Sequence, residues 1–204
     1  MHNHRLRRLR RLRGVAIAGG GRLVAARLFL QERDTPLATA DDELIVRIEA
    51  SPINPSDIGP MLAQADVAAA VVDGATTATV APIPKFAFGA HARRVGKAIP
   101  LGNEGAGVVV AAGASPAAQA LVGRTVGVVG GACYAQYRSA KVRDVLPFGP
   151  GITPRQGASW FVNPLTALGM VETMRLDGHS AIVHTAAASQ LGRMLAKVCS
   201  GTEW

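Results

Sequence analysis

Cysteine is scarce in this chain of 204 residues. The only two, Cys133 and Cys199, stand far apart and form neither a C-x-x-C pair nor any other spacing typical of a metal site. A disulfide-rich scaffold and a cysteine-based metal centre are therefore excluded. We interpret both residues as ordinary thiols of a protein in a reducing, cytoplasmic compartment.

Aromatic residues make up only 4% of the chain, so a packed core must consist mostly of Ala, Val, Leu and Ile. Hydrophobic residues reach 49% and charged residues 18%, which excludes global disorder. Long apolar runs are also missing. The longest uncharged stretch, residues 105–123, is interrupted by Gly107, Gly113 and Pro116, a pattern typical of strand and turn rather than of a membrane helix. We therefore expect a soluble protein with no membrane partner.

The net charge of +8 suggests a nucleic-acid partner until the charge is located along the chain. Six arginines lie within residues 5–13, and without them the balance is 16 basic against 14 acidic residues. We therefore expect no nucleic-acid binding by the folded part. Residues 1–22 are interpreted as a basic, disordered extension. A basic membrane-surface helix or an organelle-targeting segment is the alternative, because Leu6, Leu9 and Leu12 recur at helical spacing.

The pattern of residues 23–150 predicts a β-rich domain, a barrel or a sandwich. Residues 43–50 alternate as in a half-buried strand, and further strands are expected at 23–30, 105–111, 125–129 and 134–137, separated by glycines. Residues 59–100 are interpreted as a long, lid-like loop in which 86–97 form a short helix. These segments together predict short antiparallel strands around one core.

The pattern changes to helices after Pro147. Thr153 and Gln156 have the spacing of a capping box, and Asn163-Pro164 is expected to begin a helix that reaches about Arg175. A short strand at 181–184 and a helix at 189–199 follow. Residues 151–204 therefore read as the start of an α/β domain. His184 is interpreted as a core histidine with satisfied hydrogen bonds rather than as a proton donor.

Four segments contain candidate functional residues, namely residues 52–57, 102–107, 163–167 and 183–192. In the last of these, a strand, a turn of small residues and a helix start would aim backbone N–H groups at an anion, as at a dinucleotide pyrophosphate site. Of the G-x-G-x-x-G pattern only Gly192 is present, so this segment alone leaves nucleotide binding and an ordinary strand–helix turn equally open.

In this order the four segments resemble the medium-chain dehydrogenase/reductase superfamily over residues 23–199. The resemblance implies a GroES-like β-barrel domain followed by an α/β Rossmann domain, with cofactor and substrate meeting between them. Zinc-dependent members carry Cys where Asn54 stands and His where Asn103 stands, so the resemblance implies no metal. The Asn-Pro-Ser-Asp and Asn-Glu-Gly strings are similar to the zinc-independent quinone oxidoreductase and enoyl reductase branch.

That branch implies hydride transfer from NADP or NAD, with NADP favoured, to a quinone or to a conjugated enone or enoyl substrate. Asn54 would be catalytic and face the nicotinamide, and Thr166 would contact the nicotinamide ribose or carboxamide. The pyrophosphate would lie on a turn made of Ala187, Ala188, Ser189, Gln190, Leu191 and Gly192. The alternatives are a turn-stabilising Asn54 and a Thr166 that bonds back to its own helix.

One feature departs from the enoyl-thioester reductases, which use a tyrosine beyond the Asn-Pro-Ser-Asp string. Residues 58–98 contain no tyrosine, and Tyr134 and Tyr137 are interpreted as barrel packing, so the broader quinone or enone reductase is preferred.

Only 12 residues follow Gly192, whereas the residue that grips the adenosine ribose is expected about 20 residues after the glycine turn. We therefore expect a Rossmann domain truncated after its first strand and helix, and a homodimer only if that domain were complete. The alternative function is a non-catalytic GroES-like module acting in oligomerisation or binding.

Overall fold

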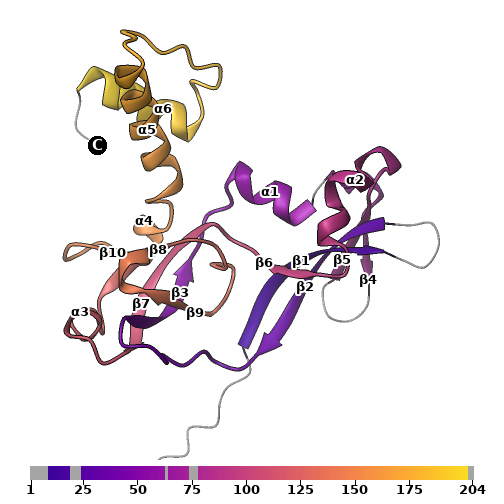
Figure 1. The fold of residues 1–204 in the computed structure, drawn as a ribbon, viewed down its shortest axis with the longest axis horizontal. Coiled ribbons are helices and arrows are strands. Elements are labelled where there is room, and N and C mark those ends of the chain that lie inside the picture. The colour runs from indigo at the N-terminus through magenta and orange to yellow at the C-terminus, as the bar shows by residue number, and fades with distance from the viewer. Residues whose placement is uncertain (1–8, 19–23, 63, 74–77, 202–204) are drawn as a thin grey trace, which may run out of the picture. The chain divides into compact units, whose positions relative to one another are not determined.

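The computed structural model describes residues 9–18, 24–62, 64–73 and 78–201 (Figure 1). The chain divides into two compact units, Met1–Ala158 and Ser159–Trp204. We expected the boundary after residue 150. It lies after Ala158 instead, because α4 (Pro154–Gly157) packs on the β-rich unit, where Ala106, Phe148 and Ala158 form one buried cluster. Each unit is described by itself below.

The first sheet of the β-rich unit has the strand order β4-β5-β2-β1-β6, with every neighbouring pair antiparallel. Its strands are β1 (Leu9–Ala18), β2 (Val24–Arg33), β4 (Val71–Asp73), β5 (Ala78–Pro82) and β6 (Ala98–Pro100).

Strand β1 corrects our expectation that residues 1–22 are a disordered extension. It pairs with β2 from Leu9 opposite Arg33 to Ala18 opposite Val24, and its other edge pairs with β6. The ladder with β2 runs along the whole of β1, and the ladder with β6 covers its residues 13–15; the leucine spacing, a local pattern, cannot reveal such pairing with distant strands. Residues 1–8 and 19–22 of the expected extension lie outside the described residues.

The second sheet has the order β10-β8-β7-β3-β9, again antiparallel throughout. Its strands are β3 (Glu43–Ala50), β7 (Glu104–Ala112), β8 (Thr125–Val129), β9 (Tyr137–Lys141) and β10 (Val145–Pro147). The main core lies on one face of this sheet, where Leu44, Val46, Val109 and Val126 are all but fully buried. Each buried methylene group there contributes about 0.8 kcal/mol. Two antiparallel sheets agree with the β-rich half that we expected, although the pairings do not by themselves define a closed barrel.

The expected strands at 43–50, 105–111 and 125–129 form, whereas the expected strand at 134–137 does not. Strand β9 begins only at Tyr137. Gly130, Gly131 and Ala132 all have positive φ angles, so the chain turns just before the expected strand, and it bends again at Tyr134 and Gln136.

Residues 59–100 are not one long loop in the described part of that range. They hold the end of α1, three strands of the first sheet, and several helical turns, of which those at 85–94 agree with the expected short helix. The helical elements of this unit are α1 (Pro55–Leu62), η1 (Val67–Ala69), η2 (Lys85–Ala87), α2 (Phe88–His91), η3 (Ala92–Arg94), α3 (Pro116–Gln119), η4 (Val142–Asp144) and α4 (Pro154–Gly157). Ala26, Ile83 and Ala87 form a small buried cluster under the segment. Elements this short show no period in the sequence, so their tertiary contacts define them.

The capping box at Thr153 and Gln156 is confirmed at the start of α4.

The second unit consists of α5 (Val162–Leu176) and α6 (Gln190–Ser200), which pack through Ala167, Val171 and Leu195 (Figure 1). The expected helix at 189–199 is confirmed, with Ser189 as its N-cap. Helix α5 starts earlier than expected, with Phe161 rather than Asn163 in the capping position.

The strand expected at 181–184 is not formed, since no described segment pairs with it. A strand exists only through its neighbours, and Val183 is 94% exposed. Among the described residues no helix is long and apolar enough to span a membrane.

Candidate functional site

The candidate site of the β-rich unit begins where β3 ends and the chain enters α1. Pro55 is the first residue of α1, and Asn54 occupies the position before it. The backbone N–H of Asn54 donates to Asp57 Oδ2 at 2.8 Å, and the backbone N–H of Asp57 donates to the Asn54 carbonyl at 2.9 Å. These two bonds close the helix start without the side chain of Asn54. The side chain is therefore free for another partner, unlike that of an ordinary capping asparagine.

Asp57 connects this helix start to the start of β7. Its Oδ1 accepts the backbone N–H of Asn103 at 2.9 Å, and the side chain is only 1% exposed. Asn103 adds a second connection, because its Nδ2 donates to Ser56 Oγ at 2.9 Å. A buried carboxylate that accepts backbone N–H groups from both segments holds them in register.

Glu104, the first residue of β7, lies behind Asn54. It is 1% exposed, and its Oε1 accepts a hydrogen bond from Asn54 Nδ2 at 2.9 Å. Asn54 itself is 4% exposed. The structure thus brings together Asn54 with Asp57 and Glu104, two buried carboxyl groups from segments 50 residues apart.

Two neighbours of this cluster, Tyr134 and Cys133, were not predicted as site residues. The hydroxyl of Tyr134 donates to the Pro52 carbonyl at 2.9 Å, and burial, together with the charge of nearby Asp57, raises its pKa. Burial also raises the pKa of Cys133 to about 11. Tyr134 reaches this place because Gly102, at φ 89°, leaves room for its ring, since a Cβ there would lie 2.6 Å from Tyr134 Cδ1. In the sequence, Gly102 was therefore the one signal that could have pointed to Tyr134 as a neighbour of the site.

The two positions at which the resemblance expects zinc ligands in zinc-dependent enzymes contain amides that already have partners. The amide nitrogen of Asn54 points to Glu104 and that of Asn103 to Ser56. Within the described part of the chain, no three His, Cys, Asp or Glu side chains gather as a metal site would require. Absence of metal therefore stays a prediction that rests on the type of side chain present.

In the second unit, the turn before α6 has the expected local geometry. Ser189 Oγ accepts the backbone N–H of Gly192 at 3.0 Å, and the Ser189 N–H donates to the Ala186 carbonyl at 2.9 Å. A Cβ at Gly192 would lie 2.5 Å from the Ala187 carbonyl oxygen, so only glycine permits this approach of helix and turn. Ala187, Ala188, Ser189 and Gln190 are exposed, and Leu191 is half-buried.

This geometry fits a pyrophosphate. Small exposed residues allow close approach to the backbone, and the first turn of α6 supplies N–H groups and the positive end of a helix dipole. The N–H of Gly192 is already used by Ser189, so residues before it in the first turn would have to bind the anion.

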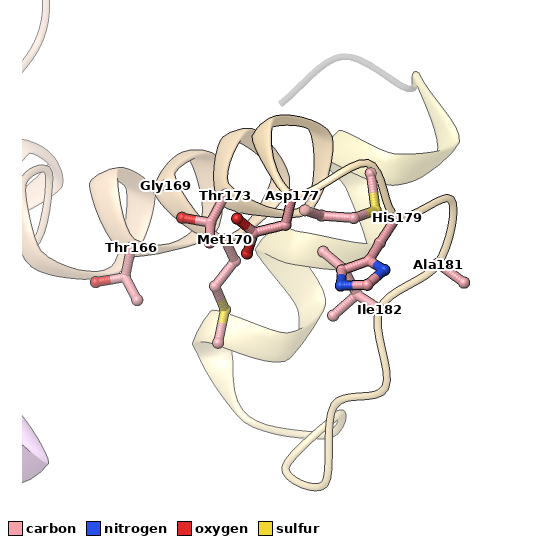
Figure 2. A pocket seen from close by; sticks show the side chains of 9 residues that line it. Thr166, Gly169, Met170, Thr173, Asp177, His179, Ala181 and Ile182 are labelled. Atoms are coloured by element: carbon pink, nitrogen blue, oxygen red, sulfur yellow. The ribbon is translucent and has the colours of Figure 1, made fainter.

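Thr166 does not share a hollow with this turn within the second unit. Thr166 lies at one end of an open hollow of about 560 Å³ along α5, with Met170, Asp177 and His179 (Figure 2). Ala187 and Gly192 line a second hollow of about 470 Å³, which shares Met174, Ala181 and Ile182 with the first. The Thr166 hydroxyl donates to the Val162 carbonyl at 2.6 Å, which is the backward bond named as the alternative, so toward a ligand it is an acceptor.

His184 differs from our expectation of a satisfied core histidine. Its ring is half-buried, and its Nδ1 is sealed from solvent without a hydrogen-bond partner among the described residues.

No family model matches this sequence, and no curated protein does either. Solved structures do match. A Mesorhizobium loti protein described as an NADPH:quinone reductase has a TM-score of 0.64 at 23% identity, covering 96% of this chain and 53% of its own. Escherichia coli quinone oxidoreductase complexed with NADPH has 0.58 at 17%, covering 94% and 49%. The CurK enoyl reductase has 0.55 at 20%, covering 86% and 47%.

These matches confirm the resemblance at the level of the fold, since all three identities lie below 25%. This chain spans about half the length of the solved structures that it matches.

Proposed function

We propose that this chain, whose fold is that of quinone oxidoreductases and enoyl reductases, provides the substrate-facing part of an NAD(P)H-dependent reductase of quinones or conjugated enones. The observation that carries the proposal is the buried cluster of Asn54, Asp57 and Glu104. Burying two carboxyl groups beside one amide is costly. Asp57 accepts backbone N–H groups that fix the two segments, whereas Glu104 accepts a hydrogen bond from the side chain of Asn54. Such clusters are concentrated at functional sites.

A bound NAD(P)H would supply the hydride, and a proton from solvent would complete reduction of the quinone or of the enone double bond. Asn54 would contribute its side-chain amide to the orientation of the nicotinamide ring. Ile53 directly precedes Asn54 and Ile58 directly follows Asp57 in the sequence, and their side chains are 69% and 48% exposed. They would give a planar apolar substrate a surface on which to lie and would exclude water from it.

In the second unit, Ala187–Gly192 would hold the pyrophosphate, and Thr166 would accept a hydrogen bond from the nicotinamide half of the cofactor. The exposed small residues and the close approach at Gly192 support this assignment. The same proposal includes a GroES-like barrel, NADP as the preferred cofactor, the absence of zinc and a cytoplasmic location. It also includes a homodimer, provided that the Rossmann domain is complete.

A non-catalytic module is the second candidate, and one observation favours it. Residues 181–184, where the first strand of a Rossmann sheet is expected, have no strand partner among the described residues, and Val183 is 94% exposed. A chain with an incomplete sheet could bind another polypeptide at this edge instead of a dinucleotide.

NADPH titration followed by nicotinamide fluorescence separates the two candidates. Reduction of benzoquinone, followed by the loss of NADPH absorbance at about 340 nm, is the second measurement. The proposal expects saturable binding, and expects Asn54→Ala to lower the reduction rate by about 10²-fold, as when a positioned hydrogen bond is lost from an active site. Gln119→Ala, which removes an exposed side-chain amide from α3, is the matched control and should leave the rate unchanged. Absence of binding at millimolar NADPH would leave the module as the better reading.

A further inference from the structure

Only the nitrogen of the Asn54 side-chain amide, and not its oxygen, has a hydrogen-bond partner among the described residues. Its backbone bonds with Asp57 already close the start of α1, so the side chain is not needed there. The nitrogen instead donates to Glu104 Oε1 at 2.9 Å inside the protein. The oxygen accepts no hydrogen bond from any described residue, and it is not among the buried atoms that lack a partner, so it faces solvent.

An ionised carboxylate can only accept hydrogen bonds, so Glu104 determines which end of the amide turns inward. Asn103 shows the contrast, because its amide nitrogen bonds to Ser56 Oγ at 2.9 Å. A hydroxyl both donates and accepts, so Ser56 would tolerate either orientation of that amide. The two asparagines thus differ in whether their partner selects the outward atom.

We propose that Glu104 is a positioning residue, which turns the carbonyl oxygen of Asn54 outward so that the site presents a hydrogen-bond acceptor. The ligand group that fits is an N–H donor, and a primary carboxamide on an aromatic ring has this chemistry. The identity of that ligand rests on the function proposed above, whereas the orientation of the amide does not.

The orientation is tested first in the free protein by NMR of side-chain amides. The Asn54 resonances are assigned by their loss in Asn54→Asp. One of the two Nδ2 hydrogens of Asn54 should exchange with solvent about tenfold more slowly than those of Asn103, since it is buried against a carboxylate. Equal exchange for the two asparagines in the wild-type protein would overturn the proposal, whatever any variant does.

The second arm compares NADPH with its 3-acetylpyridine analogue, in which a methyl group replaces the carboxamide nitrogen. The wild-type chain should bind NADPH about tenfold more tightly, because the analogue leaves the Asn54 oxygen without a donor. In Glu104→Gln the partner can accept or donate, the amide can turn, and the ratio should fall below about threefold. Glu49→Gln, an exposed position, is the matched control and should keep the wild-type ratio.

A purely structural role for Glu104 would weaken both dinucleotides in parallel and leave their ratio unchanged, which would overturn the proposal. If the wild-type chain binds neither dinucleotide, the proposed function fails, and the exchange of the Asn54 amide alone decides the orientation.

Discussion

The carboxylate of Asp57 accepts the backbone N–H of Asn103 at 2.9 Å across a separation of 46 residues. The same carboxylate accepts the N–H of Asn54 through its other oxygen. One buried group therefore joins the start of α1 to the start of β7, and both ends of the Asn54–Glu104 hydrogen bond depend on it.

Asp57→Asn should destabilise the β-rich unit by about 2 kcal/mol, because an amide retains one acceptor oxygen and turns an NH₂ group toward a backbone donor. Urea unfolding followed by circular dichroism measures the change. Asp66→Asn is the matched control, since Asp66 accepts two backbone N–H groups at η1 but is exposed. Its loss should stay below about 1 kcal/mol. Equal losses of stability in the two variants would show that the burial of Asp57 does not strengthen its hydrogen bonds.

Gly192→Ala and Gly169→Ala should have opposite effects on the second unit. A Cβ at Gly192 would meet the Ala187 and Ala186 carbonyl oxygens at 2.5 and 2.6 Å, so α6 must shift, at a cost of about 1–3 kcal/mol. A Cβ at Gly169, on α5, meets nothing within 4 Å, and alanine there should stabilise the helix by about 0.5–1 kcal/mol. Thermal unfolding by far-UV circular dichroism checks both. Destabilisation by both variants would contradict the contact geometry.

The local signals in the sequence were sufficient for some elements. Residues 43–50 alternate in polarity over a full strand, Thr153 and Gln156 form a capping box within one turn, and Ser189 caps a helix with an apolar stripe. Each of these patterns is complete within a few neighbouring residues, so it did not depend on the rest of the fold.

Features that depend on distant partners could not be predicted. Strands β4 and β6 span three residues each, too few to show a period. Residues 181–184 have a strand-like sequence but pair with none of the described strands. Tyr134 joins the candidate site only because Gly102 lets its ring approach. The resemblance identified Asn54, but its bond to Glu104 spans 50 residues and had no local signal.

Acid should weaken the β-rich unit partly through Glu43. Hydrogen bonds from Ser139, and then from the Thr39 backbone, lower its pKa from 4.5 to about 2. A depressed pKa means that the stabilisation is fully present above pH 4.5 and is lost as the pH falls toward 2. Because the group is largely solvent-screened, Glu43→Gln should lose less than about 1 kcal/mol at neutral pH.

The check for Glu43 is urea unfolding of wild type and variant between neutral pH and the acid end of that range. The difference between the two proteins should shrink as the pH falls. Glu172→Gln, whose carboxylate lies 3.8 Å from Arg175 on an exposed face, provides the comparison and should show no such trend. A difference that grows toward low pH would contradict the assignment.

The two cysteines should react very differently with a thiol reagent such as dithionitrobenzoate at neutral pH. Cys133 is 1% exposed and burial raises its pKa to about 11, so it should stay protected in the folded chain. Cys199 is exposed on α6 and should be labelled quickly. Counting released thiolate before and after unfolding tests this, and rapid modification of both thiols in the native protein would contradict it.

Every hydrogen bond described for Asn54 comes from within the unit that ends at Ala158. The groups that orient the Asn54 side chain therefore belong to one unit of the chain and would be inherited together. Evolution could exchange or remodel the α/β segment without resetting the amide, and a change of cofactor preference and a change of substrate could proceed as separate events. For engineering, the same independence makes the segment after Ala158 a suitable place for recombination between chains that share this fold.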